Sequence, residues 1–80
     1  MNEFDLVVLQ DGAANERLKE GDVGTILTVY TDGKAFEVEF VTLTGELVAV
    51  ETLLPHQIRT VRPSEVMTVR DTVAKEETNS

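Results

Sequence analysis

The chain of 80 residues contains no cysteine, which excludes a disulfide framework and a thiolate metal site. It has no apolar run near the roughly 20 residues that cross a bilayer. Its first residues lack the basic and apolar regions of a signal peptide. The absence of cysteine fits a reducing compartment. We therefore expect a cytoplasmic protein without a membrane partner.

Basic residues are also scarce. Seven Lys and Arg stand against 15 Asp and Glu, and the formal net charge is −8. This excess repels the phosphates of nucleic acids and attracts basic protein surfaces, and it also serves solubility. Arg59, Arg62 and Arg70 fall in the last third of the chain, so a local basic patch there remains an alternative. Composition thus favours a basic protein partner over nucleic acid.

Residues with catalytic chemistry are few. The single histidine, His56, follows Pro55 in a predicted turn, and a Ser-His-Asp arrangement would need Ser64 or Ser80. The glycines of Gly21-Asp22-Val23-Gly24 are too closely spaced to cradle a phosphate. No EF-hand spacing is present. We expect no enzyme activity, no cofactor and no metal site.

Residues 18–51 alternate apolar and polar side chains between short glycine turns, a pattern typical of a β-meander. Five short strands in about 60 residues predict an all-β domain that closes into a small SH3-like barrel over residues 1–63. The fifth is short and follows a 3₁₀ turn. The predicted strands are 4–10, 25–30, 36–41, 47–54 and one within 57–62.

The clearest strand is Phe36 to Val41, with three apolar side chains inward and Glu37 and Glu39 toward water. With Glu51, these glutamates could bind a hard cation weakly, but we favour a solvated face. Segment 4–10 has apolar side chains at both odd and even positions, so the predicted strand is either covered on both faces or sharply bent. Gly24 suggests a bulge or a close backbone approach. Further core residues are expected at Leu18, Ile58 and Val61, and residues 15–20 form either a helical turn or an ordered loop.

The strand register has open alternatives. A two-residue loop at Asp32-Gly33 places Leu27 and Val29 on the face of Phe36. A three-residue loop with a glycine bulge places a different set there: Ile26, Thr28 and Tyr30. At the Thr44-Gly45 turn we favour a three-residue loop, which gives two apolar pairs: Phe40 with Val48, and Val38 with Val50.

Residues 64–80 form a C-terminal extension. Ser64 to Ala74 fits a helix or a strand, and its β-branched residues favour an extended structure. Lys75 to Ser80 is polar and is predicted to be disordered.

The outward side of the sheet holds more apolar residues than a small monomer buries, which predicts an interface. The extension either covers this side or adds to the sheet edge of a second copy. We therefore predict a non-catalytic protein-interaction module, self-associating or regulating a basic partner as an antitoxin or immunity protein would. The candidate contact residues are Tyr30, Glu37, Glu39, Val41, Met67 and Val69.

Two resemblances add to this interpretation. Gly21 to Ile26, preceded by Leu18-Lys19-Glu20, resembles the turn-strand motif of KOW-type modules, which implies a nucleic-acid or ribosome-associated module as the alternative function. The segments FDLVVL, LKEGDVGTILTVY, GKAFEVEFVTLTGELVAVETL and IRTVRP resemble a family of small bacterial proteins, frequent in cyanobacteria and described only as a domain of unknown function. That resemblance implies a stand-alone SH3-like barrel and carries no catalytic residue or ligand.

Overall fold

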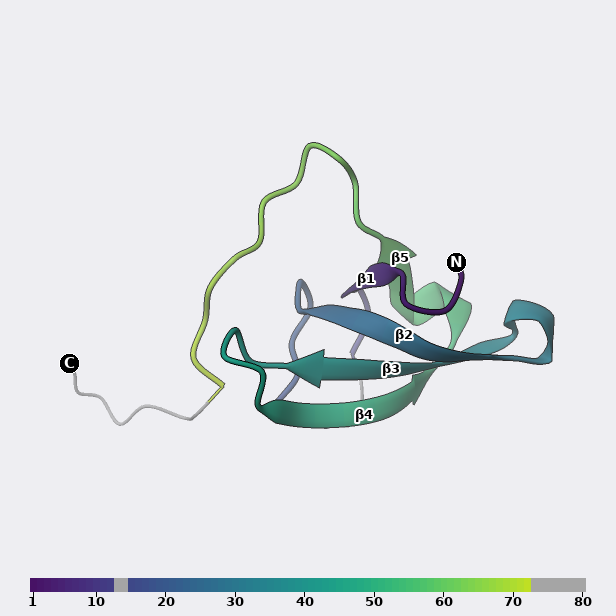
Figure 1. Ribbon diagram of the computed structural model, residues 1–80, viewed down its shortest axis with the longest axis horizontal. Helices are drawn as coiled ribbons and strands as arrows, with labels where there is room; N and C mark the ends of the chain where they lie inside the picture. The colour runs from purple at the N-terminus through teal and green to yellow at the C-terminus, as the bar shows by residue number, and fades with distance from the viewer. Residues whose placement is uncertain (13–14, 73–80) are drawn as a thin grey trace.

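The computed structural model describes residues 1–12 and 15–72 (Figure 1). Its antiparallel strands form one open sheet of order β4-β3-β2-β1-β5, which confirms the predicted all-β fold. Two 3₁₀ turns, η1 (Thr31–Gly33) and η2 (Pro55–Gln57), precede β3 and β5. None of the helical turns in the described parts of the chain could span a membrane. The strands are β1 (Leu6–Leu9), β2 (Val23–Tyr30), β3 (Ala35–Val41), β4 (Leu47–Leu53) and β5 (Ile58–Thr60).

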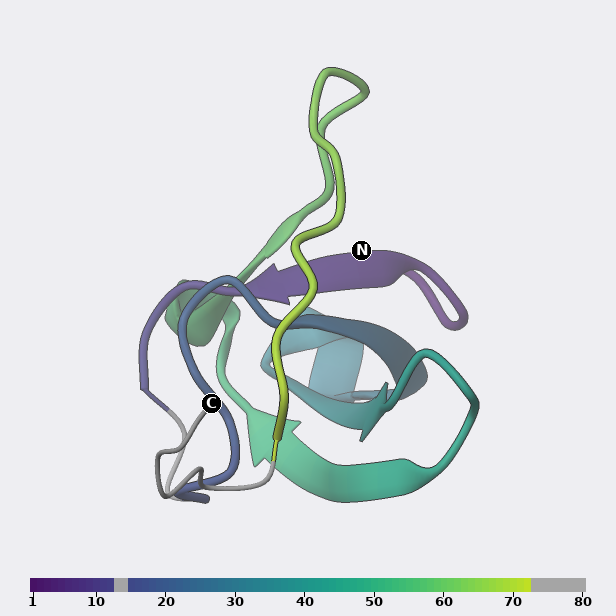
Figure 2. The ribbon, with the colours of Figure 1, turned by 90° about the vertical axis from the view of Figure 1, so that its left-hand side faces the viewer.

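The sheet coils around its inner face, where the apolar core lies (Figure 2). Leu18 and Ile58 are buried there as predicted, but Val61 is 36% exposed, so its placement in the core was wrong. Side chains of a strand alternate between its two faces, so a residue three positions after the inward Ile58 would point outward. In addition, β5 ends at Thr60, before Val61. The core residues are Val7, Leu9, Leu18, Ile26, Phe36, Val38, Phe40, Val48, Ala49, Leu53 and Ile58.

The first hairpin combines both register alternatives. Val29 lies opposite Phe36, as the two-residue loop requires, whereas Ile26 lies opposite Val38. The pairing shifts between Ile26 and Thr28, which leaves Leu27 as the extra residue of a bulge. One extra residue moves all following side chains to the other face, so each alternative is right on one side of the bulge only.

The second hairpin contains another bulge. Val41 lies opposite Leu47, but Phe40 lies opposite Ala49 and Val38 opposite Glu51. The predicted pairs with Val48 and Val50 are therefore wrong by one residue. The bulge allows the consecutive residues Val48 and Ala49 both to be buried, which regular alternation would prevent.

Gly24 and β1 confirm two predictions about close packing. A Cβ on Gly24 would lie 2.6 Å from Val38 Cγ1 and 2.9 Å from the Glu39 carbonyl oxygen, so only glycine fits this approach. The consecutive β1 residues Val7, Val8 and Leu9 are all buried, so this strand is covered on both faces. Residues 15–20 form an ordered loop, in which Asn15 Oδ1 accepts a hydrogen bond from the backbone N–H of Arg17 at 2.8 Å.

We call residues 61–72 the terminal segment. It contains neither helix nor strand, so the helical alternative is wrong for residues 64–72 and no strand forms there either. It arches away from β5 and comes down across the end of the sheet that carries the β3–β4 turn (Figures 1 and 2), and residues of both line one cavity. The predicted disorder at 75–80 lies outside the described residues.

Candidate interaction surface

The strand pairing gathers four of the six predicted contact residues on one surface. Directly opposed residues in neighbouring antiparallel strands point to the same side of a sheet. Glu37 therefore lies between Thr28 of β2 and Thr52 of β4, and Glu39 lies between Thr25 and Val50. Tyr30 flanks this array at one end, and the paired Val41 and Leu47 flank it at the other. We call this outer surface of β2, β3 and β4 the acidic face, with its main residues Tyr30, Glu37, Glu39, Val41, Leu47 and Val50.

The two glutamates of the acidic face lack a cationic partner among the residues that the structure describes. Both side chains are half-buried, and neither joins an ion pair within residues 1–12 and 15–72. Because they are two residues apart in β3, their Cα atoms are about 6.8 Å apart along the strand. Like charges at this separation on a partly desolvated surface repel each other. A cation placed above β3 would relieve that repulsion.

Glu51 does not join the other two carboxylates. It lies opposite the inward-facing Val38 and accepts a hydrogen bond from Asn15 Nδ2 at 3.4 Å. Within the parts of the chain that the structure describes, no three His, Cys, Asp or Glu side chains are close enough to hold a metal ion.

Tyr30 is coupled to the acidic face through Glu37. The phenol Oη donates a hydrogen bond to Glu37 Oε1 at 3.3 Å. The negative charge of Glu37 raises the pKa of Tyr30 above 10.0, and partial burial and the hydrogen bond act in the same direction. Tyr30 therefore remains a neutral donor that orients one of the two carboxylates.

An apolar border surrounds the glutamates. Leu47 is 58% exposed, and Tyr30, Val41 and Val50 are also exposed. Single exposed apolar side chains are normal, but a group of them around a charged centre is typical of an interaction surface.

Met67 and Val69, the other two predicted residues, lie on the terminal segment and not on the acidic face. Both are exposed, and together with Val41 they line a cavity of about 430 Å³. Val41 is thus the residue at which the acidic face meets this cavity.

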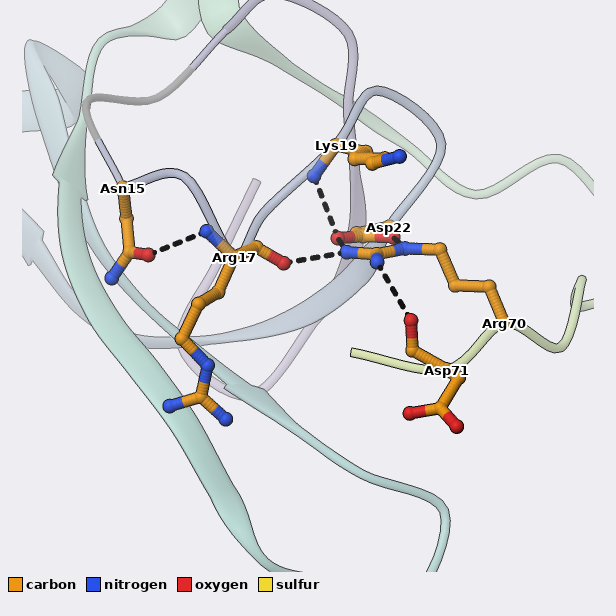
Figure 3. A network of polar contacts seen from close by, with 6 residues as sticks. All are labelled: Asn15, Arg17, Lys19, Asp22, Arg70 and Asp71. Atoms are coloured by element: carbon orange, nitrogen blue, oxygen red, sulfur yellow. Dashed lines mark hydrogen bonds and ion pairs between the residues drawn. The ribbon is translucent and has the colours of Figure 1, made fainter. Parts of the chain in front are cut away.

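Arg70 ties the terminal segment to the loop before β2 (Figure 3). Its guanidinium donates from Nε to Asp22 Oδ1 at 2.7 Å and from Nη2 to Asp22 Oδ2 at 2.5 Å. Nη2 also donates to the Arg17 carbonyl oxygen at 2.7 Å. Burial opposes ionisation of Asp22, but the hydrogen bonds from Arg70 and from the Lys19 backbone lower its pKa below 3.8.

A second bidentate pair holds the start of the terminal segment. Arg59 Nη1 donates to Glu65 Oε1 at 2.8 Å and Nη2 donates to Oε2 at 2.5 Å. These bonds, with one from the Arg62 backbone N–H, lower the pKa of Glu65 from 4.5 to about 2. Two of the three arginines in the predicted basic patch are therefore paired with carboxylates.

Sequence reasoning missed Asp22 and Glu65 as partners of these arginines. The Arg70–Asp22 contact joins residues 48 positions apart, which no local pattern reveals. The one available signal was the position of Arg70, a cation that follows a run of Val, Met and Thr.

Comparison with known proteins gives a family but no characterised relative. A search of the curated proteins gave no significant match, and neither did a search of the solved structures. Residues 3–60, which contain all five strands, match the family described as Domain of unknown function (DUF4926). This confirms the predicted resemblance to a domain-of-unknown-function family. The chain belongs to the DUF4926 family.

Proposed function

We propose that this domain is a non-catalytic protein-interaction module that binds, and so regulates or neutralises, a basic partner protein through its acidic face. The observation that carries this proposal is the pair of half-buried glutamates, Glu37 and Glu39, without a cationic partner in the described parts of the chain. A lysine or arginine of the partner would supply the missing counter-charge.

The charge of the whole chain supports the same kind of partner. A net charge of −8 accelerates encounter with a basic protein over a distance of about 10 Å at moderate salt. The apolar border then supplies contact area that salt does not weaken. We therefore expect association to be strongly salt-dependent while the bound complex keeps an apolar contribution.

The proposal also covers the fold type of the domain and its location in the cell. Four strands paired in sequence, with a fifth that returns to β1 after a 3₁₀ turn, support an SH3-like barrel. We also propose that the domain acts in the bacterial cytoplasm, as the family resemblance implies.

The nucleic-acid alternative receives less support. It rested on the KOW-like turn-strand motif and on Arg59, Arg62 and Arg70, but Arg59 is paired with Glu65 and Arg70 with Asp22. A guanidinium that already binds a carboxylate is a poorer ligand for phosphate.

Self-association is a second candidate, which the exposed Val66, Met67 and Val69 favour. Light scattering on the full chain at rising concentration tests it. A dimer that Val69→Asp dissociates would support this candidate, and a monomer at every concentration would contradict it.

Affinity capture from the source cell tests the main proposal. The bait is the full chain, compared with Glu37→Gln/Glu39→Gln and with the matched control Glu3→Gln/Glu20→Gln, which removes the same charge from exposed sites. We expect the wild type and the control to retain a basic protein that salt elutes, and the acidic-face variant to lose it. Equal retention by both variants, or bound proteins without a basic surface, would contradict the proposal.

A further inference from the structure

We propose that the basic partner is bound through an extended segment of the pattern basic-x-basic-x-apolar, whose apolar side chain enters the cavity beside the terminal segment. This inference rests on the proposed function and specifies the chemistry of the partner. It follows from the spacing of one row of side chains and from the shape and charge of the cavity at its end.

The row is formed by alternate residues of β3. Glu37, Glu39 and Val41 point to the same side of the sheet because each is two positions from the next. An extended peptide repeats at the same distance of about 6.8 Å for two residues. Two cationic side chains at alternate positions can therefore face Glu37 and Glu39, and the next alternate side chain then reaches Val41.

Of these three residues only Val41 lines the cavity, which lies at the same end of the sheet. Its volume of about 430 Å³ lies within the range of small binding sites, which is roughly 300–1,000 Å³. Buried residues from the sheet and from the loop before β2 line one side, and exposed residues of the terminal segment line the other. These are Leu18, Phe40 and Val48 on the first side, and Met67 and Val69 on the second.

The terminal segment leaves this cavity open. Val69 is 73% exposed although it lines the cavity, so its side chain does not fill the space. The segment has no strand pairing in residues 61–72, and Arg70 anchors it through Asp22 and the Arg17 carbonyl. Arg70 therefore holds this wall in place without strand pairing, and the space beside Val69 stays accessible to a side chain of the partner.

The charges around the cavity favour this occupant over an acidic lipid. The charged residues of the lining are Asp22, Arg70 and Asp71, and Arg70 is already paired with Asp22. An anionic head group would meet an arginine that a carboxylate already occupies, with a second acidic residue nearby. An apolar side chain carried on a basic segment meets no such penalty.

Two probe peptides, both acetylated and amidated, test the proposal: Lys-Thr-Lys-Thr-Leu and Lys-Thr-Lys-Thr-Ala. Each is titrated into the full chain, labelled for NMR at amides and methyl groups. We expect both to shift the amide signals of Glu37 and Glu39. Only the leucine peptide should shift the methyl signals of Leu18, Val48 and Val69, and it should bind about tenfold more tightly.

Two variants of the terminal segment provide the matched comparison. Val69→Asn makes the cavity wall polar, whereas Val66→Asn alters a residue that is 89% exposed and does not line this cavity. We expect Val69→Asn to bring the affinities of the two peptides close together and Val66→Asn to leave their ratio unchanged. Since both side chains are exposed, neither change threatens folding.

The outcomes separate the two proposals. If both peptides shift Glu37 and Glu39 but bind equally, and the methyl signals do not move, the cavity proposal is overturned and the acidic face remains. If neither peptide shifts Glu37 and Glu39, both proposals are overturned.

Discussion

The sheet and the terminal segment are held by different forces. In the sheet, Leu9, Ile26 and Val38 are completely buried, and every strand is paired with at least one neighbour. In the terminal segment, Val66 is 89% exposed and no strand forms within residues 61–72. Arginine–carboxylate pairs at Glu65 and Asp22 fix its path instead.

This difference separates the part of the chain that stabilises the fold from a part whose position can change. Burial of apolar surface contributes most of the free energy of folding and depends little on salt. Partly exposed ion pairs contribute far less and weaken with salt and with acid. The position of the terminal segment can therefore change under conditions that leave the sheet intact, and the cavity beside it would change too.

The largest contrast between the two regions is expected from truncation of one apolar side chain in each. Ile26→Ala leaves a cavity in the core and should lower the free energy of unfolding by about 2–5 kcal/mol. Val66→Ala should change it by less than about 0.5 kcal/mol, because the side chain is exposed. Urea unfolding followed by circular dichroism measures both. Similar losses would show that the segment belongs to the core.

A second contrast concerns two glycines. Gly24→Ala places a methyl group against Val38 and against the backbone of Glu39, and should cost about 1–3 kcal/mol or more. Gly12→Ala is the control, because a Cβ there has no neighbour within 4 Å. The same urea experiment compares them. If Gly24→Ala were as stable as the wild type, the close approach of β2 and β3 would be wrong.

The sequence predicted the parts of the fold that depend on local alternation. Phe36 to Val41 was correctly predicted because every second side chain is apolar, and Leu18 and Ile58 were correctly placed in the core. The bulges at Leu27 and Val48 were missed, because a bulge depends on the partner strand. The same alternation correctly placed Glu37 and Glu39 on the outward side of the sheet. The Arg70–Asp22 pair could not be predicted in this way, because it depends on a contact between distant parts of the chain.

Acid should release the start of the terminal segment. Arg59 lowers the pKa of Glu65 to about 2, so this pair contributes its full stabilisation above pH 4.5 and loses it as the pH falls through about 2. NMR titration of the Glu65 carboxyl group should give a midpoint near pH 2 in the wild type. In Arg59→Gln the midpoint should rise toward 4.5. A wild-type midpoint at 4.5 would contradict the pairing.

A smaller effect is expected at Tyr30. It is the only tyrosine and the chain has no tryptophan, so ultraviolet absorbance at alkaline pH reports its ionisation alone. Because Glu37 raises the pKa of Tyr30, Glu37→Gln should lower that pKa toward 10.0. Glu39→Gln is the control, since Glu39 makes no hydrogen bond to the phenol. Equal shifts in the two variants would contradict the contact.

The division between the sheet and the terminal segment is tested most directly by ¹⁵N relaxation of the wild type, Arg70→Gln and the control Arg62→Gln. In Arg70→Gln, the backbone order parameters of residues 66–72 should fall below about 0.6, while β1 to β5 stay near about 0.85. Arg62→Gln should resemble the wild type. Unchanged order in residues 66–72 of Arg70→Gln, or loss of order throughout the sheet, would contradict the anchoring role of Arg70.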